Sequence, residues 1–334
     1  MRVVVTGATG FVGSHLVDRL LADEAEVSIL ARASSSVGDL ERRGVGVTRI
    51  EYSAIGPLRD AVAGADVVYH VASVIKALHG SDFRAGNIDV TRNLAFACAT
   101  THPRPAKLVV MSSQAAAGPS WPGRRRSEAH APAPVSPYGA SKLMAERAAL
   151  AVENPVDTLI ARPTTVYGPR DPALAIIFQV SRFGIAPALP LNPELSLIHV
   201  SDLVSGIIQA GRSATEHGRA YFLGHPESRR FDDLVASIAR ASGRQRMIRI
   251  ALPAVAVVAA GLTAGLTQRV RRQARPFDLA KAMDVLRSSW VVDVSRARDE
   301  LAFTAETPHD DGLRSTAAWY RDNASGRTRG DSPS

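Results

Sequence analysis

The chain has 334 residues, enough for two domains or for one domain with a large appendage. Its content of 46% hydrophobic and 22% charged residues excludes a disordered or collagen-like chain. The single cysteine, Cys98, excludes an internal disulfide and a cysteine-based zinc site, and we expect no metal.

The charge balance is basic, with 40 Lys and Arg residues against 32 Asp and Glu residues. Nucleic-acid-binding domains gather their basic residues on one element. Here the arginines are spread along the chain, which favours an arginine-rich composition over a nucleic-acid partner. The sequence opens MRVVVTG, with no charged-then-apolar leader, so we expect a cytoplasmic protein.

Strand-like and helix-like segments alternate along the first half of the chain. Apolar runs predict strands at residues 2–5, 27–30, 45–52, 66–71, 107–111 and 158–161. Amphipathic patterns predict helices at about 14–22, 58–63, 84–100 and 138–152. This alternation predicts an α/β fold with a Rossmann-type, doubly wound parallel sheet, and runs such as VVV and LVVM fit strands buried on both faces.

A glycine-rich turn follows the first strand. The segment TGATGFVG, residues 6–13, stands between a strand and a helix, where a dinucleotide pyrophosphate binds at the helix N-terminus. Its glycines permit a tight turn, a close approach to phosphate and helix–strand packing. We therefore expect a dinucleotide cofactor, held by Gly7, Thr9, Gly10, Phe11, Val12 and Gly13.

The end of the second strand indicates which dinucleotide is preferred. NAD sites usually carry an acidic residue there, which binds the ribose 2′-hydroxyl. This chain has Arg32 instead, followed by three serines at 34–36. A guanidinium pairs with a 2′-phosphate through charge-assisted hydrogen bonds. NADP(H) is therefore favoured over NAD(H), and a solvated surface arginine is the alternative interpretation.

A tyrosine and a lysine open the predicted helix at 138–152. Tyr138 and Lys142 are spaced to share one helix face, one turn apart. A nearby ammonium favours the phenolate and should lower the pKa of Tyr138 from its free value of about 10. Tyr138 would then exchange a proton with a carbonyl or alcohol oxygen as hydride moves to or from a nicotinamide. Ser113, at the end of an upstream strand, would hydrogen-bond the same oxygen.

These motifs together resemble the extended short-chain dehydrogenase/reductase family, of the NAD(P)-dependent epimerase/dehydratase kind. The matching segments are TGATGFVG at 6–13, DVVYHVAS at 66–73, NIDVT at 87–91, VVMSSQAAAG at 109–118, YGASK at 138–142, ARPTTVYGPRD at 161–171, LIHVSDLV at 197–204 and AYFLGHPES at 220–228. The resemblance runs from residue 1 to about 242 and resumes weakly at 290–320.

The resemblance implies roles for individual residues. Tyr138 is implied to be the proton donor, Ser113 the catalytic serine with Ser112 as the alternative register, and Lys142 also a ligand of the nicotinamide ribose. The cofactor cleft is implied to be lined by His70, Ala72, Arg162 and Pro163. Structural roles are implied for Asn87, His199 and Asp202.

The resemblance also divides the chain. A smaller, mostly C-terminal lobe would bind substrate beside the Rossmann-type domain. The expected parts are the dinucleotide-binding domain at 1–168 with a return segment near 197–224, the substrate-binding lobe at 169–320 and a disordered tail at 321–334.

One departure bears on the substrate. Sugar-nucleotide members of the family commonly have an asparagine just before the VYGP run, which contacts substrate phosphates, and this chain has Thr165. The form RPTTVYGPRD is more similar to dihydroflavonol reductases and 3β-hydroxysteroid dehydrogenases. Residues 250–268 carry no charge, and we expect an apolar pocket wall there, with a membrane contact as the alternative.

We therefore expect an NADP(H)-dependent carbonyl reductase or alcohol dehydrogenase that acts on a hydrophobic ketone, aldehyde or secondary alcohol. A sugar-nucleotide epimerase or dehydratase with tightly bound NAD(P) is one alternative, and a non-catalytic NADP-binding protein is another. The expected partner is a small apolar molecule, with no nucleic acid. The sequence leaves open the substrate's identity, the direction and stereochemistry of the reaction, and a homodimer.

Overall fold

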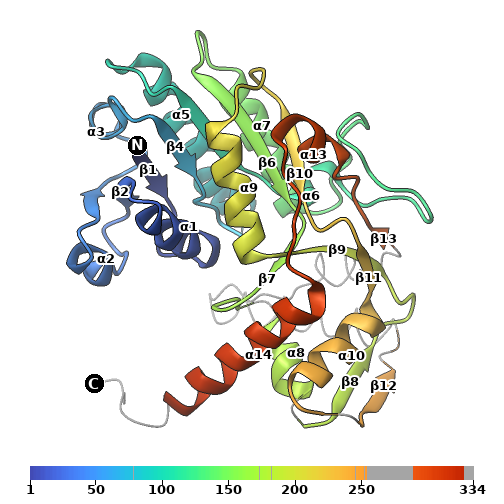
Figure 1. The fold of residues 1–334 in the computed structure, drawn as a ribbon. Helices are drawn as coiled ribbons and strands as arrows, with labels where there is room; N and C mark the ends of the chain where they lie inside the picture. The colour runs from blue at the N-terminus through green and yellow to red at the C-terminus, as the bar shows by residue number, and fades with distance from the viewer. Residues whose placement is uncertain are drawn as a thin grey trace.

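The computed structural model describes residues 1–251, apart from residues 78, 173, 182 and 245, together with residue 253 and residues 289–326. A large sheet with flanking helices forms the main body, and a smaller lobe of short strands and helices lies beside it (Figure 1). Helix α14 (His309–Gly326) runs along the smaller lobe.

The main sheet has seven parallel strands. In spatial order they are β10 (Ala220–Leu223), β6 (Asp157–Pro163), β5 (Lys107–Met111), β4 (Val67–His70), β1 (Arg2–Thr6), β2 (Glu26–Ala31) and β3 (Gly46–Arg49). The strand order reverses between β1 and β4, which opens a crevice at their carboxyl ends, where ligands of such sheets bind. The predicted Rossmann-type sheet is confirmed.

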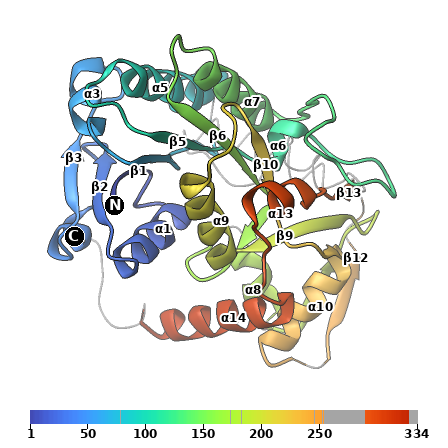
Figure 2. The same cartoon turned by 45° about the horizontal axis from the view of Figure 1, so that its top comes forward.

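Alternation along the buried strands distributes side chains to two separate cores. Val3 and Val5 of β1 face one core and Val4 faces the other, because successive residues of a strand point to opposite faces. Two sets of helices close these cores (Figure 2). They are α1 (Phe11–Ala22), α9 (Val200–Arg212) and α13 (Ser295–Leu301) on one face, and α3 (Ile55–Val62), α5 (Val90–Thr100) and α7 (Pro137–Leu150) on the other.

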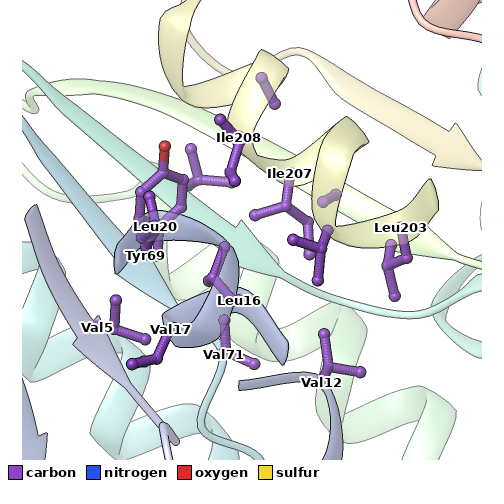
Figure 3. Close-up of a cluster of buried hydrophobic side chains, with 14 of the residues drawn as sticks. Val5, Val12, Leu16, Val17, Leu20, Tyr69, Val71, Leu203, Ile207 and Ile208 are labelled. Atoms are coloured by element: carbon purple, nitrogen blue, oxygen red, sulfur yellow. The ribbon is translucent and has the colours of Figure 1, made fainter. Parts of the chain in front are cut away.

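Figure 3 shows how the first of these cores fixes α1 against the sheet. Leu16 and Leu20 of α1 meet Leu203 and Ile207 of α9, and all four side chains are buried. Burying side chains of this size stabilises the fold by about 1.5–3 kcal/mol each. The packing therefore holds the first turn of α1 beside the end of β1, where the glycine turn lies.

The helix predicted at 84–100 is interrupted. A short α4 (Gly80–Phe83) leads into a π-helix, η1 (Arg84–Asp89), and only then into α5. The wider turn carries Asn87 inward, where its side chain is buried. Asn87 Oδ1 accepts from the Val74 backbone N–H at 2.7 Å, and Nδ2 donates to Ser141 Oγ at 2.9 Å. Asn87 thus ties the loop after β4 to α7.

The smaller lobe is built around a second sheet. Its elements are the four-stranded sheet of β7 (Thr165–Tyr167), β9 (Glu194–His199), β11 (Ser228–Arg230) and β13 (Ser289–Trp290), the pair β8 (Ile185–Ala188) and β12 (Ile248–Ala251), and the helices α8 (Ala175–Ser181) and α10 (Phe231–Ala241). Because β9 pairs with β7 here, the chain returns to the main sheet only at α9 and β10, later than residue 197.

Two expectations about the C-terminal half fall partly outside the described residues. Helix α14 continues through Gly326, so the first part of the tail expected at 321–334 is helical, and the rest lies outside the described residues. Of the apolar stretch 250–268, only residues 250, 251 and 253 are described. Within the part of the chain that the structure describes, no helix is long and apolar enough to cross a membrane.

Candidate active site

The glycine turn packs directly against the loop that follows β4. Gly7 has a φ of +73°, and a Cβ on it would lie 2.6 Å from the Ala72 backbone nitrogen. A Cβ on Gly13 would lie 2.1 Å from the Gly7 carbonyl oxygen. No side chain caps α1, whose N-cap is the exposed Gly10. The unfilled N–H groups of its first turn and its positive dipole end therefore suit a pyrophosphate.

His70 joins the turn to α5 through both of its ring nitrogens. Nδ1 lies 2.8 Å from Thr6 Oγ1, and Nε2 lies 2.8 Å from Thr91 Oγ1. Thr91 gives its one proton to the Asn87 carbonyl oxygen at 2.6 Å, so it must accept from His70 Nε2–H. Nδ1 then accepts from the Thr6 hydroxyl, which itself accepts from the Ala72 N–H at 3.1 Å.

This network fixes His70 as a neutral ring. Burial, with the Lys142 ammonium nearby, lowers the pKa of His70 to about 3. The family resemblance implies that His70 lines the cofactor cleft. Its ring is instead buried and committed to protein hydrogen bonds, so the side chain orients Thr6 and the loop at Ala72 and leaves only the backbone to face a ligand.

Arg32 lies directly after β2 and is exposed. Among the described residues, no carboxylate lies within ion-pair distance of its guanidinium. A second arginine orders the same loop: Arg49 Nη1 donates to the backbone carbonyls of Arg32, Ala33 and Ser35 at 3.3, 3.0 and 3.3 Å. Arg49 therefore orders the loop at 32–35, and the Arg32 guanidinium, which has no carboxylate partner among the described residues, lies at the carboxyl end of β2.

The three predicted catalytic residues come from two neighbouring segments. Ser113 follows β5 and caps the short helix α6 (Gln114–Ala117), where its Oγ accepts from Ala115 N–H at 3.1 Å. Tyr138 lies in the first turn of α7, whose N-cap Ser136 accepts from Gly139 N–H at 3.2 Å. The two meet because α6 and α7 pack closely: a Cβ on Gly139 would lie 2.3 Å from the Ala115 carbonyl oxygen.

The pKa of Tyr138 differs from the sequence-based prediction. Burial raises it above its ordinary value, and hydrogen bonding with Ser113 and Ser73 only partly opposes this. The prediction of a lowered pKa is therefore wrong for the protein without cofactor. The reason is the burial of the phenol, which outweighs its hydrogen bonds. The Lys142 ammonium donates to the Met111 carbonyl oxygen at 2.7 Å and to Ser73 Oγ at 3.5 Å.

Lys142 is fully buried, which lowers its pKa to about 8, and the Glu146 carboxylate opposes that effect. Glu146 lies one turn further along α7 and is itself buried. Sequence reasoning missed it, although its spacing of four from Lys142 placed it on the same face of the helix. Tyr138, Lys142 and Glu146 thus form one line along α7.

Arg162 does not have a free side chain. Its Nε and Nη2 donate to Glu146 Oε1 and Oε2 at 2.9 and 2.7 Å, and both side chains are buried. The Ser112 hydroxyl also donates to Glu146 Oε1. Ser112 is thereby excluded as the serine beside Tyr138. Of the implied pair at the nicotinamide, Arg162 is committed to this network, and Pro163 ends β6 beside Leu223 of β10.

The remaining motif residues support the junction of the two lobes. His199 caps α9, with its Nδ1 2.7 Å from Ser201 Oγ. Asp202 accepts from the Thr307 hydroxyl at 2.8 Å, which fixes the segment before α14. Thr165 accepts from Gln114 Nε2 at 3.5 Å. These contacts agree with a structural role for His199 and Asp202.

The family model described as the NAD dependent epimerase/dehydratase family matches residues 3–224. The chain belongs to this family. Its members include NAD(P)-dependent oxidoreductases, and the resemblance inferred from the motifs is confirmed.

Individual members of the family differ in activity. The chain is 28% identical over 321 residues to the ceramide reductase of Caulobacter vibrioides, a match that covers 96% of this chain and 94% of that protein. It is 35% identical to a putative dihydroflavonol 4-reductase of Synechocystis over 66% of this chain and 67% of that protein. The UDP-glucuronic acid 4-epimerase of Bacillus cereus, solved with UDP-glucuronic acid and NAD, shares the fold with a TM-score of 0.74 and 22% identity, covering 97% of this chain and 100% of that one.

Proposed function

We propose that the protein is an NADP(H)-dependent oxidoreductase that transfers a hydride between the nicotinamide and a hydrophobic ketone, aldehyde or secondary alcohol. The observation that carries this proposal is the meeting of Ser113, Tyr138 and Lys142 at the carboxyl end of β5, beside the loop after β4. A proton donor, an oxygen-binding hydroxyl and a buried ammonium at one place suit carbonyl reduction.

The residues present fit a dinucleotide. The uncapped first turn of α1 would bind the pyrophosphate, since its backbone N–H groups have no side-chain partner and its N-cap Gly10 is exposed. Arg32 would pair with the 2′-phosphate, and Lys142 would hydrogen-bond the nicotinamide ribose, with Ala72 and Pro163 lining the cleft. Such a cofactor supplies or accepts the hydride.

The side chains account for the movement of the proton. Its raised pKa keeps Tyr138 protonated near neutral pH, in the form that donates a proton to a carbonyl oxygen. Ser113 would hydrogen-bond the same oxygen as negative charge develops on it. The Lys142 ammonium would stabilise the phenolate left behind.

Two observations support an apolar substrate. One of the relatives that span nearly the whole chain is named for the reduction of a ceramide, which is a lipid. In the described part of the smaller lobe, Phe183 and Ile248 are large apolar side chains exposed by 67% and 73%. Surface of that kind suits an apolar ligand. The stretch 250–268 stays an expected pocket wall outside the described residues.

A sugar-nucleotide epimerase is the second candidate, because the fold is shared with a UDP-glucuronic acid 4-epimerase. Thr165 stands where such enzymes commonly have an asparagine, and it favours the reductase. A non-catalytic NADP-binding protein is the third, and it gives no reason for Ser113 to be placed against Tyr138.

A cofactor-linked absorbance screen tests the proposal. The purified chain is mixed with NADPH or NADH and with a series of ketones and aldehydes of increasing apolar size, and with UDP- and dTDP-sugars. We expect NADPH oxidation that rises with apolar size of the carbonyl. Conversion of a UDP- or dTDP-sugar without turnover of any bulky carbonyl would instead establish the epimerase or dehydratase.

A further inference from the structure

The Glu146 carboxylate lies at the junction of three elements that carry the site. It belongs to α7 and accepts hydrogen bonds from Arg162 on β6 and from Ser112 just after β5. Both carboxylate oxygens are therefore occupied and the group has no freedom to turn. Buried charges held in this way are costly to form and costly to disturb singly.

The same junction determines where Lys142 points. Ser112 lies between Met111, whose carbonyl oxygen accepts from Lys142 Nζ at 2.7 Å, and Ser113, which faces Tyr138. The hydrogen bond from Ser112 to Glu146 therefore fixes both neighbours of Ser112 with respect to α7. These neighbours are Met111, whose carbonyl oxygen accepts from Lys142, and Ser113, which faces Tyr138. Because Lys142 and Glu146 are one helical turn apart, any shift of α7 would move both groups together.

The negative charge of Glu146 also affects the ionisation of Lys142. The titratable side chains around Lys142 are Tyr138 and Glu146 on α7, His70 on β4 and Arg162 on β6. His70 is neutral, Tyr138 is protonated, and the Arg162 cation is paired. Among the described residues, Glu146 is the acidic side chain whose charge favours protonated Lys142 against the effect of burial.

We propose that Glu146 is a positioning residue of this site, which with Ser112 and Arg162 keeps Lys142 in its ammonium form and aimed at the Met111 carbonyl beside Tyr138. The proposal rests on the proposed function for its consequence in catalysis. The ionisation of Lys142 itself depends only on the fold, so it can be measured without a substrate or a cofactor.

The small number of lysines makes that measurement practical. The chain has four, Lys76, Lys107, Lys142 and Lys281, so NMR of isotopically labelled lysine side chains gives few signals to assign. The signal of Lys142 is the one missing from a Lys142→Arg variant. Its titration is followed in the full-length wild-type chain and in Glu146→Gln, after circular dichroism has shown that the variant is folded.

We expect Glu146→Gln to lower the titration midpoint of Lys142 by about one pH unit or more, because the opposing carboxylate is gone. The matched control is Glu128→Gln, which neutralises another buried carboxylate, one that accepts from the Phe222 N–H at 2.7 Å. It should leave the Lys142 titration unchanged. An unchanged midpoint in folded Glu146→Gln, or an equal shift in Glu128→Gln, would overturn the proposal.

A double variant covers the case in which Glu146→Gln does not fold. Glu146→Gln combined with Arg162→Met removes both partners of the ion pair, so the buried guanidinium is not left without its carboxylate. It should also lower the Lys142 midpoint, and a wild-type midpoint would contradict the proposal. Where turnover is found, the alkaline limit of kcat should move to lower pH in parallel. If neither the wild-type chain nor any variant turns over a carbonyl, while the NMR shift of Lys142 is present, the result counts against the proposed function and not against the role of Glu146.

Discussion

The hydroxyls of Ser112 and Ser113 face opposite ways although the residues are neighbours. Ser112 Oγ donates to the buried Glu146 carboxylate, whereas Ser113 Oγ interacts with the Tyr138 phenol. Ser113 has extended backbone, with φ −164° and ψ 152°, and successive side chains of an extended chain point to opposite sides. Ser112 therefore stabilises the buried Glu146 carboxylate, and Ser113 faces the position of the reacting oxygen.

Alanine at each serine should separate the two roles. Ser113→Ala should lower kcat by about 10²–10³-fold, since it removes a donor to the developing oxyanion. It should also cost about 0.5–2 kcal/mol of unfolding free energy, because Ser113 caps α6. Ser112→Ala should cost about 1.5–3 kcal/mol of unfolding free energy, as a hydrogen bond to a buried charge is lost, and should lower kcat far less. Steady-state kinetics and urea unfolding of both variants check this, and equal kcat losses would contradict the assignment.

His70 should make the protein sensitive to acid. Its pKa is about 3 when folded, below its ordinary 6.5, so the unfolded chain binds a proton that the folded chain does not. The stability this gives is complete above pH 6.5 and is lost as pH falls toward 3. His70→Gln removes this titration, so the stability advantage of the wild-type chain over the variant should shrink by about 3 kcal/mol between about pH 7 and about pH 4.

Urea unfolding at a series of pH values measures this difference. The matched control is His130→Gln, at an exposed histidine in the loop before α7. The pH dependence of its stability should follow that of the wild-type chain. A constant difference between wild-type and His70→Gln across the range would show that the pKa of His70 is the same in the folded and unfolded chains, and would contradict the neutral, buried ring.

Cofactor preference should depend on Arg32 and on the arginine that orders its loop. Arg32→Asp should raise the Kd for NADPH by at least about 10- to 100-fold, the worth of a charge-assisted hydrogen bond, and shift preference toward NADH. Arg49→Met should weaken NADPH binding by a smaller factor, because the three backbone carbonyls it holds are released. Both are read by fluorescence titration with each cofactor.

Arg42→Asp controls for the change in net charge. Arg42 is exposed and pairs with Asp39 on α2 (Gly38–Arg42), away from the loop at 32–35. The Arg42→Asp variant should bind NADPH and NADH as the wild-type chain does. Wild-type affinity for NADH equal to or above that for NADPH would contradict the proposed preference.

The sequence predicted those parts of the fold that follow from local pattern. The glycine turn, the buried strands and the spacing of Tyr138 and Lys142 could each be read from residue types at fixed intervals. The π-helix over Arg84–Asp89 could not, because nothing in its composition distinguishes it from a regular helix start. The wider turn places Asn87 where it makes its tertiary hydrogen bonds with Val74 and Ser141.

The parts of the site that the sequence did not predict are contacts between distant segments. Glu146 and Arg162 are ordinary charged residues in the sequence, and only the packing of α7 on β6 makes them a buried pair. The resemblance implies that His70 lines the cofactor cleft, yet hydrogen bonds with Thr6 of β1 and Thr91 of α5 occupy both of its ring nitrogens. The prediction of a lowered pKa for Tyr138 is wrong for the same reason, since burial of the phenol between distant segments raises its pKa.

The most direct test of the account is Tyr138→Phe, assayed with the carbonyl that the wild-type chain reduces fastest. The substitution keeps the ring and removes the transferable proton. NADPH oxidation and NADPH binding are measured on the same preparation. With Tyr138 as the proton donor, kcat should fall by about 10²–10⁴-fold while the Kd for NADPH stays within about twofold of wild type. Turnover close to the wild-type rate in Tyr138→Phe would contradict the role of Tyr138 as the proton donor.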